Sequence, residues 1–299
     1  MQLTQEQVKK NFMQLTQEQV EQYQEQGYLL LPEYFSQHEI SVMSAQIPAA
    51  MANDAVKKDW EPDGKTFRSL LGIIEHKFFY DLARHPRLLN LAQQLLDSEV
   101  YIFRSRINSK PAFTGGMWPW HQDFSYSHYL DGVPSPRIIK AIIFLDEMNE
   151  FNGPLYIIPG SHQEGILDVK TEAELTTARS EKTDGSIASS SPFSTAFLPY
   201  TTPREAITKL VDKQGIVATK GSTGTILLLH PSVVHGSVSN ISPFQRRILN
   251  ITYNSVENLP ITHSKESRPG TVPSQDYTPL QHLDAEEADQ LLSDKALSS

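Results

Sequence analysis

His121 and Asp123 are the residues of this chain whose types and spacing point most directly to chemistry. On an extended segment side chains alternate with a period of two, so a His and a carboxylate two positions apart point the same way. His235, far along the chain, would complete a set of three ligands. Two imidazoles and a carboxylate on one face of a metal ion leave the opposite face open, which is the arrangement of non-heme Fe(II) oxygenases.

The segment after His235 supplies groups that suit an acidic co-substrate. Ser237 places a hydroxyl beside the His, and Arg246 and Arg247 stand at the start of a predicted strand. The planar fork of an arginine can bind a carboxylate through two hydrogen bonds. We expect one arginine of this pair to reach the site and the other to be a solvated strand end. His230, just before His235, is an alternative metal ligand.

Composition limits the classes of ligand and partner. The chain has 299 residues, a formal net charge of −9 and no cysteine. This excludes disulfides, thiolate nucleophiles, Cys-ligated zinc and iron–sulfur clusters, so a metal must be held by His and carboxylates. The acidic charge argues against nucleic acid and anionic membranes as partners, and no apolar run is long enough for a membrane span. We expect a cytoplasmic protein with a small-molecule substrate, and a homo-oligomer is compatible with the sequence.

The predicted elements indicate a mainly β fold with flanking α-helices. Helices are predicted over residues 16–26, 36–52, 77–83, 86–97 and 285–288, with Pro48 expected to kink or shorten the second. Strands are predicted over residues 28–31, 100–108, 137–145, 155–158, 215–219, 225–229 and 247–253. Many short strands separated by turns, without regular intervening helices, favour a β-sandwich or jelly roll.

We expect a single domain over residues 13–299. Residues 1–8 recur unchanged as residues 13–20, so residues 1–12 are interpreted as a duplicated N-terminal extension, either disordered or the product of an alternative start. A long insertion is predicted at about residues 163–212, where residues 185–194 are dominated by serine. This insertion is either a lid over the site or an ordinary surface insertion.

Several motifs, taken in order, resemble those of the phytanoyl-CoA dioxygenase family, and of its ectoine-hydroxylase branch in particular. They are Arg106-Ile107-Asn108 with Lys110, Trp120-His121-Gln122-Asp123-Phe124, Asp131-Gly132-Val133-Pro134, Glu150-Phe151-Asn152-Gly153-Pro154-Leu155, Pro159-Gly160-Ser161-His162, His235-Gly236-Ser237 and Tyr253-Asn254. The resemblance covers about residues 16–280. It implies a double-stranded β-helix, that is, a cupin-like jelly roll, with Fe(II) as cofactor and 2-oxoglutarate and O2 as co-substrates.

The same resemblance implies roles for individual residues. The iron ligands fall on His121, Asp123 and His235. The binding site for 2-oxoglutarate falls on Arg246, assisted by Ser237, Lys110 and Asn108. Because an Asp rather than a Gly or Ala occupies the carboxylate position, no ligand position is left for a halide, and hydroxylation is favoured over halogenation.

The positions expected to contact the substrate differ from the ectoine-hydroxylase pattern. Those enzymes carry Gln where this chain has Arg104, and Trp where it has Ser127. Loss of the Trp widens the pocket, and the Arg adds a fixed positive charge. We therefore expect a substrate that is bulkier than ectoine and carries an anionic group such as a carboxylate or sulfate. Trp120 is the third residue that we expect to contact the substrate. Alternatively, Arg104 is a surface residue of its strand and does not line the pocket.

The predicted reaction is hydroxylation of an unactivated C–H bond in a small polar natural product, as a late step in the biosynthesis of a secondary metabolite similar to an alkaloid toxin. The alternative is hydroxylation of a free aliphatic amino acid such as leucine. Two rivals belong to other classes. A non-catalytic jelly-roll binding protein would have little reason to keep both the triad and Arg246, and a zinc hydrolase would work without oxygen or a keto acid.

Overall fold

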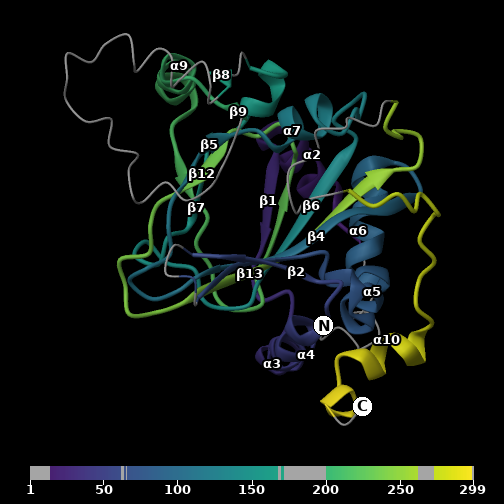
Figure 1. Cartoon of the computed structure of the whole chain (residues 1–299). Helices are drawn as coiled ribbons and strands as arrows, with labels where there is room; N and C mark the ends of the chain where they lie inside the picture. The colour runs from purple at the N-terminus through teal and green to yellow at the C-terminus, as the bar shows by residue number, and fades with distance from the viewer. Residues whose placement is uncertain are drawn as a thin grey trace, which may run out of the picture.

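Two antiparallel sheets form the body of the molecule in the computed structural model, which describes residues 14–61, 64, 66–167, 170–171, 200–261 and 273–297. The large sheet contains, in order, β1 (Tyr28–Leu31), β11 (Ile226–Leu229), β6 (Ile138–Phe144), β13 (Arg246–Ser255), β4 (Val100–Lys110), β3 (Phe67–Leu71) and β2 (Lys57–Trp60). The small sheet contains β10 (Val217–Ala218), β7 (Leu155–Ile157), β12 (His235–Ser237) and β5 (Trp118–His121). The sheets are the two layers of a jelly roll, so the predicted fold is confirmed (Figure 1).

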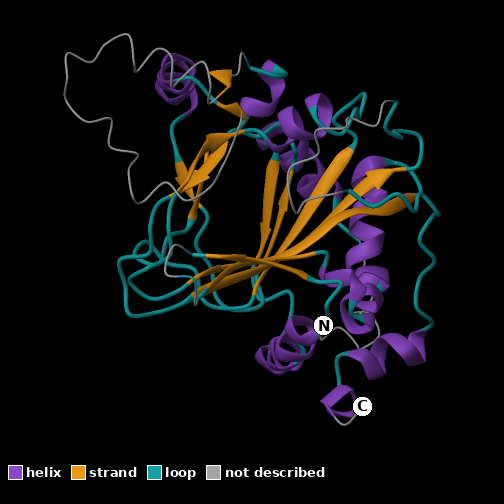
Figure 2. Ribbon diagram, viewed as in Figure 1, coloured by secondary structure: helices purple, strands orange, loops and turns teal. Residues whose placement is uncertain are grey.

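Helices flank this body, mostly on the side of the large sheet that faces away from the small one (Figure 2). They are α2 (Gln17–Gln26), α3 (Gln37–Ala45), α4 (Ile47–Ala52), α5 (Lys77–Arg84), α6 (Pro86–Leu96), α7 (Asp123–Tyr129), α9 (Arg204–Gln214) and α10 (Ala285–Leu291). Short 3-10 turns cover Ile73–Glu75, Ser161–Glu164 and Asp294–Leu297, and β8 (Lys170–Thr171) pairs with β9 (Tyr200–Thr201) as a separate ribbon.

The first two helical segments show how local sequence sets the boundaries. Thr16 and Gln19 form the predicted capping box of α2, and Gly27 ends the helix in the left-handed conformation, with φ 76°. The single helix predicted over 36–52 is instead two helices, α3 and α4. Pro48 lies in the first turn of α4, where its missing N–H is not needed for a helical hydrogen bond.

Two strands of the large sheet carry polar residues into the space between the sheets. Because side chains alternate along a strand, Arg104, Arg106 and Asn108 of β4 share one side, as do Lys140 and Ile142 of β6. The residues between them on both strands are buried, most of them in the apolar core beneath the helices. The large sheet therefore separates an apolar, helix-covered layer from a polar interior.

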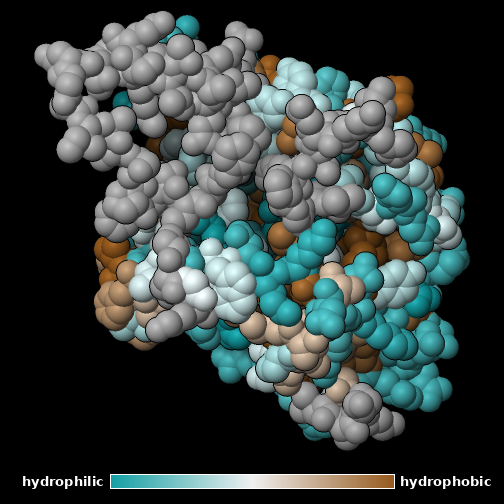
Figure 3. Space-filling view, viewed as in Figure 1, coloured by the Kyte–Doolittle hydropathy of each residue, from teal (hydrophilic) through white to brown (hydrophobic). Residues whose placement is uncertain are grey.

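The exposed surface in Figure 3 is largely hydrophilic where its residues are described, with apolar groups lying between polar ones. Within the described ranges, no helix is long and apolar enough to cross a membrane. Residues 1–12 and most of the insertion predicted at 163–212 lie outside the described residues, so both interpretations stay predictions.

Candidate active site

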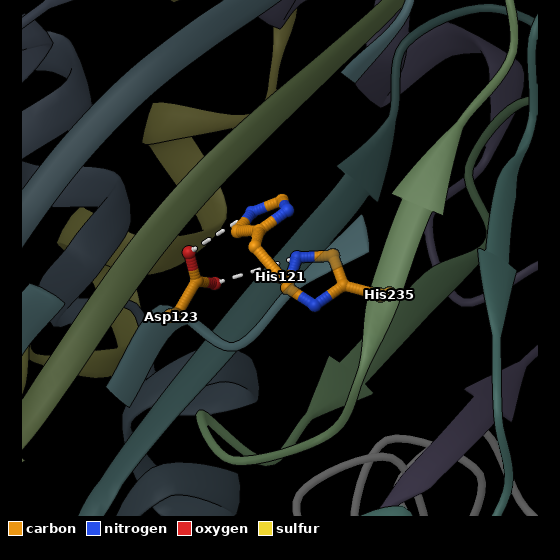
Figure 4. Close-up of side chains that lie close together, drawn as sticks. All are labelled: His121, Asp123 and His235. Carbon is orange, nitrogen blue, oxygen red and sulfur yellow. Dashed lines mark ion pairs between the residues drawn. The ribbon is translucent and has the colours of Figure 1, made fainter. Parts of the chain in front are cut away.

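His121, Asp123 and His235 lie together between the two sheets, with their ligand atoms within 4.8 Å of one another. His121 ends β5, His235 begins β12, and the two residues pair across the small sheet. Asp123 points toward both imidazoles (Figure 4): its Oδ1 lies 3.7 Å from His121 Nε2, and its Oδ2 lies 3.7 Å from His235 Nε2. The structure thus brings together the three residues selected from the sequence.

The expectation that His121 and Asp123 share one extended strand is wrong for Asp123, which is the first residue of α7. The intervening Gln122 is extended, with φ −111° and ψ 128°, and this places the carboxylate on the side of His121. The buried Gln122 amide donates to the backbone carbonyls of Ser232 at 2.7 Å and Gly165 at 2.8 Å. Gln122 therefore ties the first two ligands to the turn that precedes His235.

Each imidazole presents its Nε2 to the cluster. Nδ1 of His121 lies 2.7 Å from the Pro119 carbonyl, and Nδ1 of His235 lies 2.9 Å from the Val233 carbonyl. A carbonyl only accepts hydrogen bonds, so Nδ1 carries the proton and the Nε2 lone pair is available to a metal. Burial lowers the pKa of both histidines and keeps them neutral, the form that binds metals.

Asp123 has a cationic neighbour, Lys140, that was not predicted. Nζ of Lys140 makes a close contact with Asp123 Oδ2. Burial opposes ionisation, but the charges of Lys140, the two histidines and Arg106 hold the pKa of Asp123 well below its usual range. The sequence did contain a signal, because a lysine inside an apolar strand such as Ile138–Phe144 needs an anionic partner.

Two neutral imidazoles and one ionised carboxylate fit an Fe(II) ion bound on one face. A cavity lies beside them. Three of the residues predicted to bind 2-oxoglutarate line this cavity, namely Asn108, Ser237 and Arg246. The fourth, Lys110, does not: its buried ammonium donates to the Val238 carbonyl.

Arg246 and Arg247 have different surroundings. The Arg246 side chain is 2% exposed and donates from Nη2 to the Gly153 carbonyl at 2.9 Å. Its Nε has no hydrogen-bond partner in the part of the chain that the structure describes. Burial lowers the pKa of Arg246 to about 9, so the guanidinium still carries its charge at neutral pH. Arg247 is not simply a solvated strand end, since it binds both oxygens of Asp146 at 2.8 and 2.9 Å.

Trp120 was expected to contact the substrate, and this stays a prediction. Of the two tryptophans of β5, Trp118 lines the metal cavity, whereas Trp120 lines neither of the two cavities beside the triad. His121 pairs with His235, whereas Trp118 pairs with Ser237. Strand β5 therefore advances three residues where β12 advances two, which is a β-bulge. The bulge places Trp118 on the side of His121. Trp120 packs instead against an apolar cluster formed by Ile158, Val234 and Leu210.

Arg104 and Ser127 line a second cavity, which also borders Asp123 and Lys140. Both residues are thus near the metal cluster, as predicted, but the charge of Arg104 is not free. Its Nη2 lies 2.7 Å from Oδ2 of Asp131, whose side chain is 1% exposed. A buried ion pair of this kind compensates the arginine and weakens the argument that Arg104 selects an anion.

Arg106 is a cation whose importance was not predicted. It lines both cavities, and burial lowers its pKa while the charge of Asp123 acts in the opposite direction. No hydrogen bond or ion pair joins its side chain to another described residue. Its position two residues from Arg104 and two from Asn108, on one face of β4, was the available signal.

The alternative ligand His230 is not part of the cluster. Its Nδ1 accepts a hydrogen bond from the Ser232 amide at 3.2 Å, and its ring lies 4.9 Å from the ring of His162. Burial lowers the pKa of His230 to about 3. His230 therefore acts as a neutral, hydrogen-bonded residue of the packing around α2.

Comparison with known proteins agrees with this geometry. The family model for phytanoyl-CoA dioxygenase (PhyH) matches residues 23–248. L-proline trans-4-hydroxylase from Streptomyces griseoviridis is 34% identical over 267 residues, which cover 88% of this chain and 94% of the relative. Ectoine dioxygenase from Bordetella bronchiseptica is 34% identical over 245 residues, covering 80% and 75%.

Solved structures show the same relationship. The crystal structure of EctD from S. alaskensis with 2-oxoglutarate and 5-hydroxyectoine has a TM-score of 0.72 and 28% sequence identity, and the match covers 90% of this chain and 87% of that one. The iron-bound form of that protein has a TM-score of 0.71. With the family model matching most of its length, this chain belongs to the phytanoyl-CoA dioxygenase family.

Proposed function

We propose that this protein hydroxylates an unactivated C–H bond of a small, polar natural product that carries a carboxylate, as a late step in the biosynthesis of a secondary metabolite. Membership of the family supports the general reaction: the chain is an Fe(II)- and 2-oxoglutarate-dependent hydroxylase that acts on a small molecule. The observation that carries the proposal is Arg106, a half-buried arginine that lines both cavities together with Asp123 and whose guanidinium pairs with no other described residue.

The charge around the triad supports an anionic substrate. The metal cavity is lined by three cations, Arg106, Lys140 and Arg246, and by one carboxylate, Asp123, which leaves a surplus of two positive charges. A divalent metal and the dianion of 2-oxoglutarate would cancel each other and leave this surplus unchanged. Unbalanced charge in a buried site is costly. A substrate carboxylate would reduce this imbalance.

We assign the remaining groups by their position. Bound Fe(II) together with 2-oxoglutarate and O2 supplies the oxidising power that attacks carbon. His121, Asp123 and His235 would hold the metal, and Arg246 would bind the far carboxylate of 2-oxoglutarate beside Ser237 and Asn108. These last three residues lie in the same cavity. Its apolar lining residues, Ile142, Leu155 and Ile248, would exclude water.

The space beyond the metal favours a substrate larger than a free amino acid. The cavity lined by Ser127 has no tryptophan wall. Arg104 and Arg106 also border an outer cavity, which is lined by Leu71, Ile74 and Phe103 among others. A molecule anchored at Arg106 could therefore extend into this partly apolar outer space.

A second candidate is hydroxylation of a free amino acid. It is favoured by the similarity to L-proline trans-4-hydroxylase, which extends over 88% of this chain. Both candidates have a carboxylate in common, so Arg106 supports each of them. They differ in how much of the outer cavity the substrate would fill.

The test is a substrate panel of alkaloids and amino acids, each offered as the free acid and as its methyl ester, with product detected by mass spectrometry as a gain of one oxygen. We expect a free acid to be hydroxylated and its ester to be a much poorer substrate. Arg106→Gln should lower kcat/KM for the acid about 10- to 100-fold, because a charge-assisted hydrogen bond is lost.

The matched control is Arg137→Gln, which removes a surface arginine paired with Glu257 and should leave turnover unchanged. Equal turnover of acid and ester by the native protein would contradict the proposal. The member of the panel that gains oxygen decides between a natural product and an amino acid.

A further inference from the structure

We propose that Lys140 is a positioning residue that holds one carboxylate oxygen of Asp123, so that Asp123 binds the metal through its other oxygen alone. The inference rests on the metal site of the proposed function. It does not depend on which substrate is hydroxylated.

The two oxygens of Asp123 stand in equivalent relation to the imidazoles. Oδ1 lies 3.7 Å from Nε2 of His121, and Oδ2 lies 3.7 Å from Nε2 of His235. The histidines therefore do not determine how many oxygens face the metal. Lys140 breaks this symmetry, because its ammonium contacts Oδ2.

The sheet holds Lys140 in place. It lies on β6, which pairs on one side with β13, where Lys140 is opposite Thr252, and on the other with β11, where it is opposite Leu229. Its side chain is 11% exposed, and that of Asp123 is 20% exposed. Asp123 belongs to a different element, the first turn of α7. The contact thus joins the start of α7 to a strand that is hydrogen-bonded on both edges.

The consequence concerns the open face of the metal. In octahedral geometry, three protein ligand atoms leave three positions, enough for the two chelating atoms of 2-oxoglutarate and for O2. A carboxylate that bound through both oxygens would take one of these positions. A carboxylate oxygen that accepts a hydrogen bond from an ammonium is a weaker ligand for the metal. Residues that hydrogen-bond to a metal ligand in this way fix its orientation and alter its affinity for the metal. Lys140 therefore keeps the position free for the co-substrates.

The test uses Lys140→Met, which keeps the length of the side chain and removes its charge, without any substrate. Metal affinity is measured by titrating metal-free protein with Co(II), and 2-oxoglutarate affinity by titrating the Co(II)-loaded protein without oxygen. We expect the metal to bind about tenfold more tightly, because the repelling ammonium is gone and a second oxygen can bind. We expect 2-oxoglutarate to bind about tenfold more weakly, in the range seen for such outer partners.

The opposite signs of these two changes distinguish positioning from damage to the fold. The electronic spectrum of the Co(II) form should also shift toward higher coordination number, and Lys140→Arg should restore both affinities and the spectrum. Lys220→Met is the matched control, because Lys220 also pairs with an acid, Glu150, but both side chains are 52% exposed.

Parallel weakening of both affinities in Lys140→Met would overturn the proposal and leave Lys140 a purely structural residue. Unchanged binding of 2-oxoglutarate would overturn it as well, whatever happens to the metal. Neither outcome bears on Arg106 or on the substrate panel, so failure here is separate from failure of the proposed function.

Discussion

Adjacent arginines at the start of β13 illustrate how far the function of a residue depends on its side of the strand. The side chain of Arg247 donates two hydrogen bonds to the carboxylate of Asp146. Arg246 faces the cavity and keeps its Nε without a partner among the described residues. A buried donor of this kind carries a free-energy cost that a ligand carboxylate would remove. On these grounds we propose that Arg246, and not Arg247, binds 2-oxoglutarate.

We predict that Arg246→Ala raises the KM for 2-oxoglutarate about 10- to 100-fold, the loss expected for a charge-assisted pair. Arg247→Ala is the control: it should lower the free energy of unfolding without changing this KM. Steady-state kinetics and chemical unfolding of both variants would check the assignment. An unchanged KM in Arg246→Ala, or an equal rise in both variants, would show that the co-substrate is held elsewhere.

At the scale of elements, the site is assembled by two local irregularities. The bulge in β5 places Trp118 on the side of His121 and leaves Trp120 on the opposite side, and the start of α7 takes Asp123 out of the strand. Neither is readable from the alternation of residue types, which assumes a regular strand. The histidine and carboxylate could be selected from sequence because their chemistry is distinctive. The residues that support them, Gln122 and Lys140, were not selected, although a lysine inside an apolar strand was a signal for the second.

The N-terminus of α6 carries a buried histidine that makes the stability of the fold depend on pH. His85 precedes this helix, is 6% exposed, and accepts a hydrogen bond at Nδ1 from the Arg87 amide at 3.1 Å. Burial, assisted by the charge of Arg87, lowers its pKa to about 4. The unfolded chain therefore takes up this proton first as the pH falls, and stability is lost between the unfolded pKa of about 6.5 and the folded one.

Asn at this position would still cap the helix but does not titrate. Between pH 7 and pH 5, we expect the native chain to lose about 2 kcal/mol more unfolding free energy than His85→Asn. Urea unfolding of the metal-free proteins at the two pH values measures the difference. If both proteins lost the same amount, His85 would not be neutral in the folded state.

For the whole molecule, the sequence was sufficient to predict the class of fold and to select the three side chains that converge as candidate metal ligands. Short strands separated by turns predicted the jelly roll, and His121, Asp123 and His235 do converge. What could not be predicted depends on packing between distant segments. Asp131 lies close enough to Arg104 to compensate its charge, and this contact joins β4 to the residues after α7. The sequence predicted that Arg104 would select an anionic substrate, but its charge is compensated by Asp131, and no local sequence pattern connects these two residues.

The small sheet and the start of α7 bring His121, His235 and Asp123 together, and we infer that these residues bind one ferrous ion with room for a keto acid. The most direct measurement is an anaerobic titration of metal-free protein with Fe(II), followed by 2-oxoglutarate and monitored by absorption for the chelate complex. We predict one equivalent of iron and a new absorption band in the native chain and in His230→Gln, and neither in His235→Ala. Iron binding and an unchanged band in His235→Ala would contradict the account.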